Sequence, residues 1–140
     1  MFKKILVGYD GSKPSREALR IAFELARQPS SAVIALAVVR PPEFAELEGE
    51  IQEAIDESVH GPLAEAFRWA REQARQRGLQ LTLLVRVGHP AETLVRMAEE
   101  EGCDLIVLGR RGLTSVQRWM LGSVSERVLR YAHGAVMVVH

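Results

Sequence analysis

The feature that most constrains the fold is a repeated alternation of short apolar runs with segments of helical periodicity. Five runs predict strands, at residues 5–7, 33–39, 81–87, 105–108 and 135–139. Four of them are nearly continuous in apolar residues and rich in β-branched types, as in parallel strands that helices cover on both faces. The run 81–87 is more polar, which predicts a strand near an edge of the sheet.

Apolar stripes with the period of an amphipathic helix lie between the predicted strands. The first covers residues 18–26, with Ser12 as a candidate cap and Pro14 in the first turn. Three more follow at 63–74, 91–98 and 124–129, each beside a glycine or proline that opens or ends a helix. This order predicts right-handed crossovers and an α/β fold with a doubly wound parallel sheet.

Length and composition indicate one domain over residues 1–140. The chain has 140 residues, of which 47% are hydrophobic and 26% are charged, and it contains no linker or low-complexity tract. The segment 43–57 holds seven acidic residues and no basic one, while apolar residues recur at helical spacing. We expect a solvated acidic helix there, and its use as a docking surface for a partner stays open.

Charge and cysteine content exclude several classes of protein. Lysine and arginine number 18, as do aspartate and glutamate, so the chain lacks the basic surplus of a protein that coats nucleic acid. The longest apolar run has eight residues, too few for a membrane span, and we expect a cytoplasmic protein. The single Cys103 excludes an internal disulfide, and the histidines share no metal-ligand spacing. We therefore predict no metal site.

A glycine-rich pattern follows the predicted fourth strand. The residues 109–112 read Gly-Arg-Arg-Gly, and nine residues later 122–125 read Gly-Ser-Val-Ser at the start of the last helix. Ligands of open parallel sheets bind beyond the carboxyl ends of the strands, and a glycine-lined helix start offers free N–H donors. The stretch 110–130 has five arginines against one acid, Glu126. These features predict a phosphate-binding site, with ordinary tight turns as the alternative.

The motif Gly109-x2-Gly112-x9-Gly122-Ser123 resembles the nucleotide-binding motif of the universal stress protein family, in its ATP-binding branch. Four further blocks resemble the family in the same order, at residues 4–12, 88–90, 104–109 and 122–129. The resemblance covers essentially the whole chain. It implies a single-domain, doubly wound, five-stranded parallel sheet in the order 3-2-1-4-5, flanked by about four helices.

The resemblance also implies roles for individual residues. Asp10 matches the acid that contacts the ribose or adenine. Val38 matches the position whose backbone contacts the adenine. The ribose and phosphate contacts match Gly109, Arg111, Gly112, Gly122, Ser123, Val124 and Ser125. Arg110 and Arg111 fill variable positions, where a guanidinium pairs with phosphate or faces solvent. Ser12 completes the candidate set, with helix capping as the alternative for it and for Asp10.

The function that the resemblance implies is that of an ATP-binding stress-response or signalling protein. Such a protein acts through ligand-dependent conformation or association with little or no turnover. The Walker and Gly-x-Gly-x-x-Gly patterns and a Gly-x-Ser-x-Gly nucleophile are absent from the sequence. Slow ATP hydrolysis at the same site, or a protein-interaction role with a vestigial pocket, are the alternatives, and participation of Mg²⁺ stays open.

The last predicted strand, 135–139, indicates how the chain assembles. In the order 3-2-1-4-5 it lies at an edge, and it is apolar on both faces without proline, lysine or glutamate. An uncovered apolar edge promotes aggregation unless it is paired. Members of the family that the chain resembles often dimerise through this strand. We therefore predict a homodimer that pairs this strand with its own copy, with Val136 and Val138 at the centre.

Overall fold

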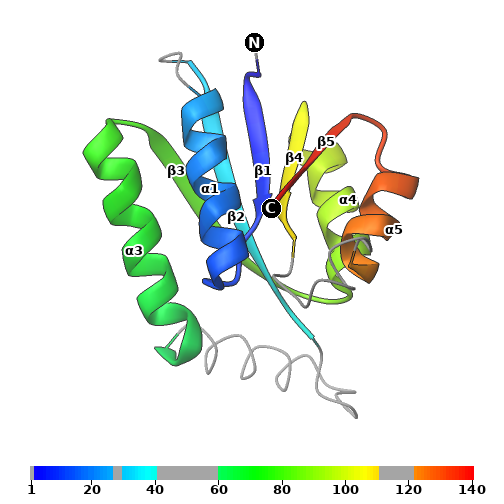
Figure 1. Cartoon of the computed structure of the whole chain (residues 1–140), viewed down its shortest axis with the longest axis horizontal. Helices are drawn as coiled ribbons and strands as arrows, with labels where there is room; N and C mark the ends of the chain where they lie inside the picture. The colour runs from blue at the N-terminus through cyan, green and yellow to red at the C-terminus, as the bar shows by residue number, and fades with distance from the viewer. Residues whose placement is uncertain (1, 27–29, 41–59, 111–121) are drawn as a thin grey trace.

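The computed structural model describes residues 2–26, 30–40, 60–110 and 122–140. All five expected strands form, and their bounds are β1 (Lys4–Gly8), β2 (Ala32–Val39), β3 (Gln80–Val87), β4 (Leu105–Gly109) and β5 (Ala135–Val139). They make one parallel sheet in the order β3-β2-β1-β4-β5 (Figure 1). The predicted doubly wound α/β fold and its strand order are confirmed.

Four helices flank the sheet in the described part of the chain, namely α1 (Lys13–Leu25), α3 (Pro62–Arg77), α4 (Pro90–Glu101) and α5 (Ser123–Tyr131). They follow the four predicted stripes. As expected, α3 and α4 end at glycines, Gly78 and Gly102, with left-handed φ values of +64° and +67°. No helix in the described ranges is long and apolar enough to cross a bilayer. The acidic helix expected over 43–57 lies outside the described residues.

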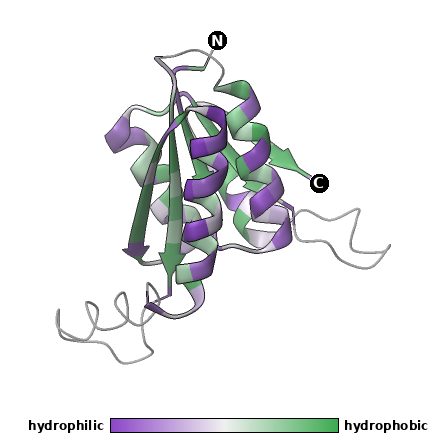
Figure 2. Cartoon of the chain, turned by 90° about the vertical axis from the view of Figure 1, so that its left-hand side faces the viewer, coloured by the Kyte–Doolittle hydropathy of each residue, from purple (hydrophilic) through white to green (hydrophobic). Residues whose placement is uncertain are grey.

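The core has two layers because successive strand residues face opposite sides of the sheet. Ile5 and Val7 pack with α1 and α3 on one side, whereas Leu6 and Ile34 pack with α4 and α5 on the other. The central strands are therefore covered on both faces, which explains their nearly continuous apolar runs. Figure 2 shows the same arrangement, with hydrophobic strands inside and hydrophilic residues on the outer faces of the helices.

The two edge strands differ in polarity. β3 lies at one edge, as its more polar sequence predicted, and exposes Gln80, Thr82 and Arg86. β5 forms the other edge with an apolar sequence, of which Ala135 is exposed and the next four residues are half-buried. Of the two edges of the sheet, the one at β5 is therefore the more apolar.

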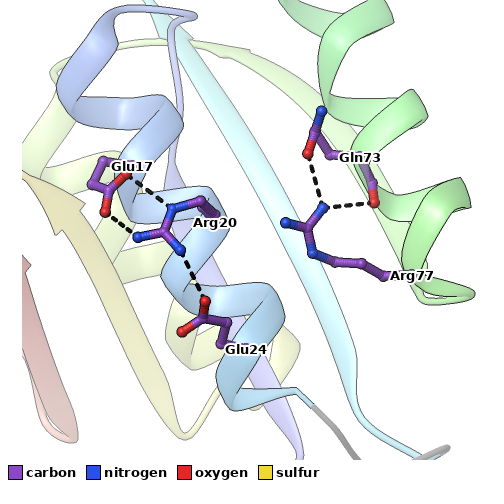
Figure 3. Close-up of polar contacts among 5 residues, drawn as sticks. All are labelled: Glu17, Arg20, Glu24, Gln73 and Arg77. Atoms are coloured by element: carbon purple, nitrogen blue, oxygen red, sulfur yellow. Dashed lines mark hydrogen bonds and ion pairs between the residues drawn. The ribbon is translucent and has the colours of Figure 1, made fainter.

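Polar and charged side chains of α1 and α3 make hydrogen bonds and ion pairs along each helix (Figure 3). Arg20 lies between Glu17 and Glu24, and its guanidinium is 2.8 Å from the Glu24 carboxylate. Arg77 donates hydrogen bonds to the backbone and side-chain oxygens of Gln73. Solvated pairs of this kind contribute little to stability, because water and salt screen the charges. The stability of this layer therefore comes mainly from the apolar contacts beneath it.

Candidate functional site

A pocket of about 430 Å³ opens at the carboxyl ends of β1, β2 and β4. The winding of the sheet reverses at this point, because the chain passes from β1 to β2 on one side and later to β4 on the other. Ligands of open parallel sheets bind at such switch points. Among the described residues, the amino-terminal parts of α1, α4 and α5 also line the pocket. Strand ends and helix N-termini therefore converge on one cavity.

Most of the predicted site residues line this pocket. The structure brings together Asp10, Ser12, Val38, Gly109, Gly122, Ser123, Val124 and Ser125. Arg110 lies outside the lining: its backbone N–H donates to the Val139 carbonyl at 2.7 Å, and its guanidinium is 3.3 Å from the His140 ring. Arg111 and Gly112 lie outside the described residues. Contact with a nucleotide stays a prediction for all eleven.

A compact turn carries the chain from β1 into α1. The Ser12 N–H donates to the Asp10 carboxylate at 2.9 Å, and the Ser15 hydroxyl donates to the Ser12 carbonyl at 2.9 Å. The Ser12 side chain in turn accepts from the Ser15 N–H at 3.4 Å and caps the helix. Gly11 has a φ of +86°, and a Cβ there would lie 2.5 Å from the Ala66 side chain. The turn therefore requires glycine at this position.

The Asp10 carboxylate is the charged group of this turn. Removal of part of the carboxyl group from water raises its pKa, but hydrogen bonds from Ser12 and Ser15 outweigh that effect and hold the pKa below the ordinary value of 3.8. Asp10 is therefore ionised at neutral pH. An ionised carboxylate accepts hydrogen bonds from hydroxyl and N–H groups and repels phosphate. Asp10 therefore suits a neutral, hydroxyl-bearing part of a ligand.

The N-terminus of α5 lies on the other side of the pocket. Gly122 is the N-cap, with φ −62° and ψ 156°, and among the described residues no side chain caps this helix. A Cβ built on Gly122 meets no described atom within 4 Å. The first amides of a helix have no partners within it, and the positive end of its dipole favours anions. Together with the hydroxyls of Ser123 and Ser125, these amides are donors of the kind that anions accept.

Gly109, at the end of β4, has a packing role that its sequence position did not indicate. A Cβ there would lie 2.2 Å from the Pro14 carbonyl oxygen and 2.8 Å from the Ser15 nitrogen. Backbone atoms cannot give way as a flexible side chain does. The end of β4 thus packs directly on the first turn of α1, which requires glycine regardless of any ligand.

Several residues that line the pocket were not predicted from the sequence. Arg40 follows the last residue of β2 and Ser15 lies in the first turn of α1, so the rule that ligands bind at carboxyl strand ends could have found both. Leu36 precedes Val38 by two residues on β2 and faces the same side of the sheet. The remaining apolar lining includes Pro90 and Leu94 of α4, which only the tertiary structure places there.

Tyr9 anchors the end of β1 to α3. Its ring is 2% exposed, its hydroxyl donates to the Ala66 carbonyl at 2.5 Å, and it stacks on Trp69 with ring centroids 6.4 Å apart. Burial raises the pKa of Tyr9 to about 12. The phenol therefore stays neutral and acts as a hydrogen-bond donor that ties the end of β1 to α3.

Cys103 lies away from this pocket, just before β4. Burial raises the pKa of its thiol to about 11, so the thiol is protonated at neutral pH and packs as a small apolar side chain. In the described ranges, no three His, Cys, Asp or Glu side chains gather as a metal site would require.

Comparison with known proteins identifies the family of this chain. The model of the universal stress protein family matches residues 1–140. The chain belongs to the universal stress protein family. The universal stress protein MJ0531 of Methanocaldococcus jannaschii is 36% identical over 140 residues, covering 99% of this chain and 82% of that protein. The universal stress protein YxiE of Bacillus subtilis is 33% identical, covering 99% of each.

Solved structures of the family share the architecture. The MJ0577 protein of Methanocaldococcus jannaschii superposes with a TM-score of 0.80 at 29% identity, over 99% of this chain and 96% of that one. A universal stress protein in complex with cAMP gives a TM-score of 0.73 at 27% identity, over 99% and 97%. The strand order of this chain therefore belongs to an architecture that these family members share.

Proposed function

We propose that this universal stress protein binds an adenine nucleotide, ATP, in the pocket at the switch point of its sheet. The observation that carries the proposal is the N-terminus of α5, which opens on the pocket without a side-chain cap among the described residues. Its first amides, which have no partners within the helix, and the hydroxyls of Ser123 and Ser125 suit phosphate oxygens. The cAMP complex of a related family member supports a nucleotide as the ligand.

The lining fits a nucleoside as well as a phosphate. Leu36 and Val38 of β2, with Pro90 and Leu94 of α4, make one end of the pocket apolar. A nucleotide with its phosphates on α5 places its base at this apolar end and its sugar hydroxyls near Asp10. The cavity volume of about 430 Å³ falls within the range of small-molecule sites.

The protein acts through ligand-dependent conformation or association with little or no turnover. Phosphoryl transfer needs an acid that holds a metal and a positioned base near the γ-phosphate. Among the described lining residues Asp10 is the one carboxylate, and the proposed pose puts it beside the sugar. Steady release of phosphate above about 1 per second, an ordinary enzymatic rate, would contradict this proposal.

Mass spectrometry of the ligand released from freshly purified, denatured protein tests the function. We expect an adenine nucleotide, and calorimetry of the emptied protein should then identify the preferred one among ATP, ADP, AMP and cAMP. Repeating the titration with a chelator shows whether Mg²⁺ joins the nucleotide. A protein that releases no nucleotide and binds none of the four would rule the proposal out.

We also propose that the chain forms a homodimer through β5. The Val139 carbonyl accepts from the Arg110 N–H, so the backbone groups of Val139 point toward β4. Residues alternate along a strand, and the backbone N–H and C=O of Val138 and Val136 therefore point to the free edge. On the adjacent α5, Leu129 and Tyr131 are 44% and 62% exposed. An antiparallel copy of β5 would pair the free groups and cover apolar surface.

Val138→Pro tests the homodimer. It removes an N–H that points away from β4, so the sheet within one chain is retained and the edge loses a donor. We expect light scattering to give a dimer for the wild type and for Val138→Ala, which keeps the N–H, and a monomer for Val138→Pro. A monomeric wild type, or a folded Val138→Pro that stays dimeric, would refute pairing through β5.

A further inference from the structure

We propose that Arg40 recognises the base of the bound nucleotide by stacking its guanidinium on the face of the ring. The inference rests on the proposed function, because it assigns a residue to the base end of the same site. Arg40 follows the last residue of β2 and lines the pocket two residues beyond Val38. The glycine motif of residues 109–123, from which other site residues were predicted, gave no indication of Arg40.

Arg40 lies at the end of the pocket opposite to the proposed phosphate site. The strand order runs from β2 through β1 to β4, and α5 follows β4 in the chain. Strands in a sheet are about 4.8 Å apart, so β2 and β4 are separated by roughly 10 Å. A residue at the end of β2 is therefore near the part of the ligand farthest from its phosphates.

Charge distinguishes Arg40 from its surroundings. Among the described lining residues it is the one cation, and Asp10 is the one anion. The side chain is exposed, and within the described part of the chain it has no ion-pair partner that would hold it elsewhere. The lining beside it is apolar, with Leu36, Val38 and Pro90. An exposed cation beside an apolar lining suits a ligand group that is flat and has a π face.

The guanidinium group fits stacking better than other cations do. It is planar and weakly hydrated, and it stacks on aromatic faces, whereas the ammonium of lysine is a compact and strongly hydrated charge. Elsewhere in this chain the Arg16 guanidinium lies over the Trp69 ring at 5.0 Å from its centroid. Arg40 would make the same kind of contact with a purine, and Val38 belongs to the apolar lining beside it.

Calorimetry with ATP, and with inorganic tripolyphosphate as a competitor that has no base, separates base from phosphate recognition. The variants are Arg40→Ala and Arg40→Lys, with Arg86→Ala as a control at an exposed arginine of β3 that does not line the pocket. We expect Arg40→Ala to weaken ATP binding by about three- to tenfold, as loss of a partly exposed cation–π contact should. Arg40→Lys should lose most of the same affinity. Tripolyphosphate affinity should stay unchanged in both, and Arg86→Ala should match the wild type.

Each other result overturns the inference. Equal losses for ATP and tripolyphosphate would show that Arg40 contacts phosphate, and full affinity in Arg40→Lys would show that charge alone matters. Wild-type affinity for ATP in Arg40→Ala would refute base contact while leaving the proposed function intact. A wild-type protein that binds neither probe would refute the proposed function, and the inference would fall with it.

Discussion

Two helices begin at the same pocket, and their first turns are built differently. At α1 the Ser12 side chain accepts from the Ser15 N–H, Pro14 has no N–H to offer, and Gly109 packs against the turn. At α5 the N-cap is Gly122, no described side chain caps the helix, and the space beside its Cα is open to the described atoms. The first turn of α1 is thus closed, and that of α5 is open.

Under the proposed function, this difference assigns a structural role to one helix start and a binding role to the other. The first four N–H groups of any helix need partners, which are side chains, water or a ligand. The turn at α1 uses its own serines and therefore fixes the geometry of Asp10. In the proposed function, the turn at α5 offers its donors to an anion. Changes at α1 should therefore act mainly on stability, and changes at α5 mainly on affinity.

The largest effect is expected at Gly109, on the closed side. In Gly109→Ala the new Cβ would lie 2.2 Å from the Pro14 carbonyl oxygen, so β4 or α1 must shift. We expect the free energy of unfolding in urea to fall by about 3 kcal/mol or more, at the upper end for overpacking. Wild-type stability in this variant would mean that β4 and α1 do not pack as closely as the structure shows.

Gly122→Val should have the next largest effect, on the open side. The φ and ψ of Gly122 are available to valine and no described atom lies within 4 Å of the new Cβ, so the fold should persist. The side chain would cover the first amides of α5. We expect ATP affinity by calorimetry to fall by about 100-fold or more, as loss of several charge-assisted hydrogen bonds would cause. Gly134→Val, at a glycine before β5, is the matched control and should bind normally. Full ATP affinity in folded Gly122→Val would place the site elsewhere.

The variants Ser12→Ala and Ser123→Ala test the difference between the first turns of α1 and α5, because each removes one hydroxyl at the pocket. Loss of the Ser12 cap should lower stability by about 1 kcal/mol. Ser123 is exposed at the open turn, so its loss should leave stability near the wild-type value and weaken ATP binding. Thermal unfolding and calorimetry of both variants check this. The opposite assignment, with Ser123 needed for stability and Ser12 for affinity, would contradict the division.

The smallest effect concerns Asp10 and pH. Its folded-state pKa is below 3.8, so it contributes stability above that value, and the contribution is lost as pH falls through the folded-state pKa. Asp10→Asn should therefore be less stable than the wild type near neutral pH, by less than about 1 kcal/mol because the group is exposed to solvent. The difference should vanish in acid. Urea unfolding at several pH values measures it, and a difference that grows in acid would reverse the assigned sign.

Most of the fold could be predicted from local sequence. The apolar runs gave the strands to within a residue, and Ser12 and Pro14 marked the start of α1. The alternation alone does not set the order of the strands, because each crossover can step to either side. That order came from the resemblance to the family, and the sheet confirms it.

The site was less accessible to sequence analysis. Residues after the strands were predictable because parallel strands end at one edge, and most of the candidates do line the pocket. The close approach of Gly109 to Pro14 was not predictable. A glycine after a strand looks the same in the sequence whether it faces a ligand or packs on a helix. Leu94 was not predictable either, since its place in the lining depends on how α4 packs.

An ¹⁵N-labelled sample titrated with ATP would test the comparison most directly, because it reports on each backbone amide. We predict that the amides of Ser123, Val124 and Ser125 at the open turn show the largest chemical-shift changes. The amide of Ser15, which the Ser12 side chain already occupies, should shift much less. Large shifts at Ser15 with none at 123–125 would show that the phosphates bind at α1, and would contradict the account.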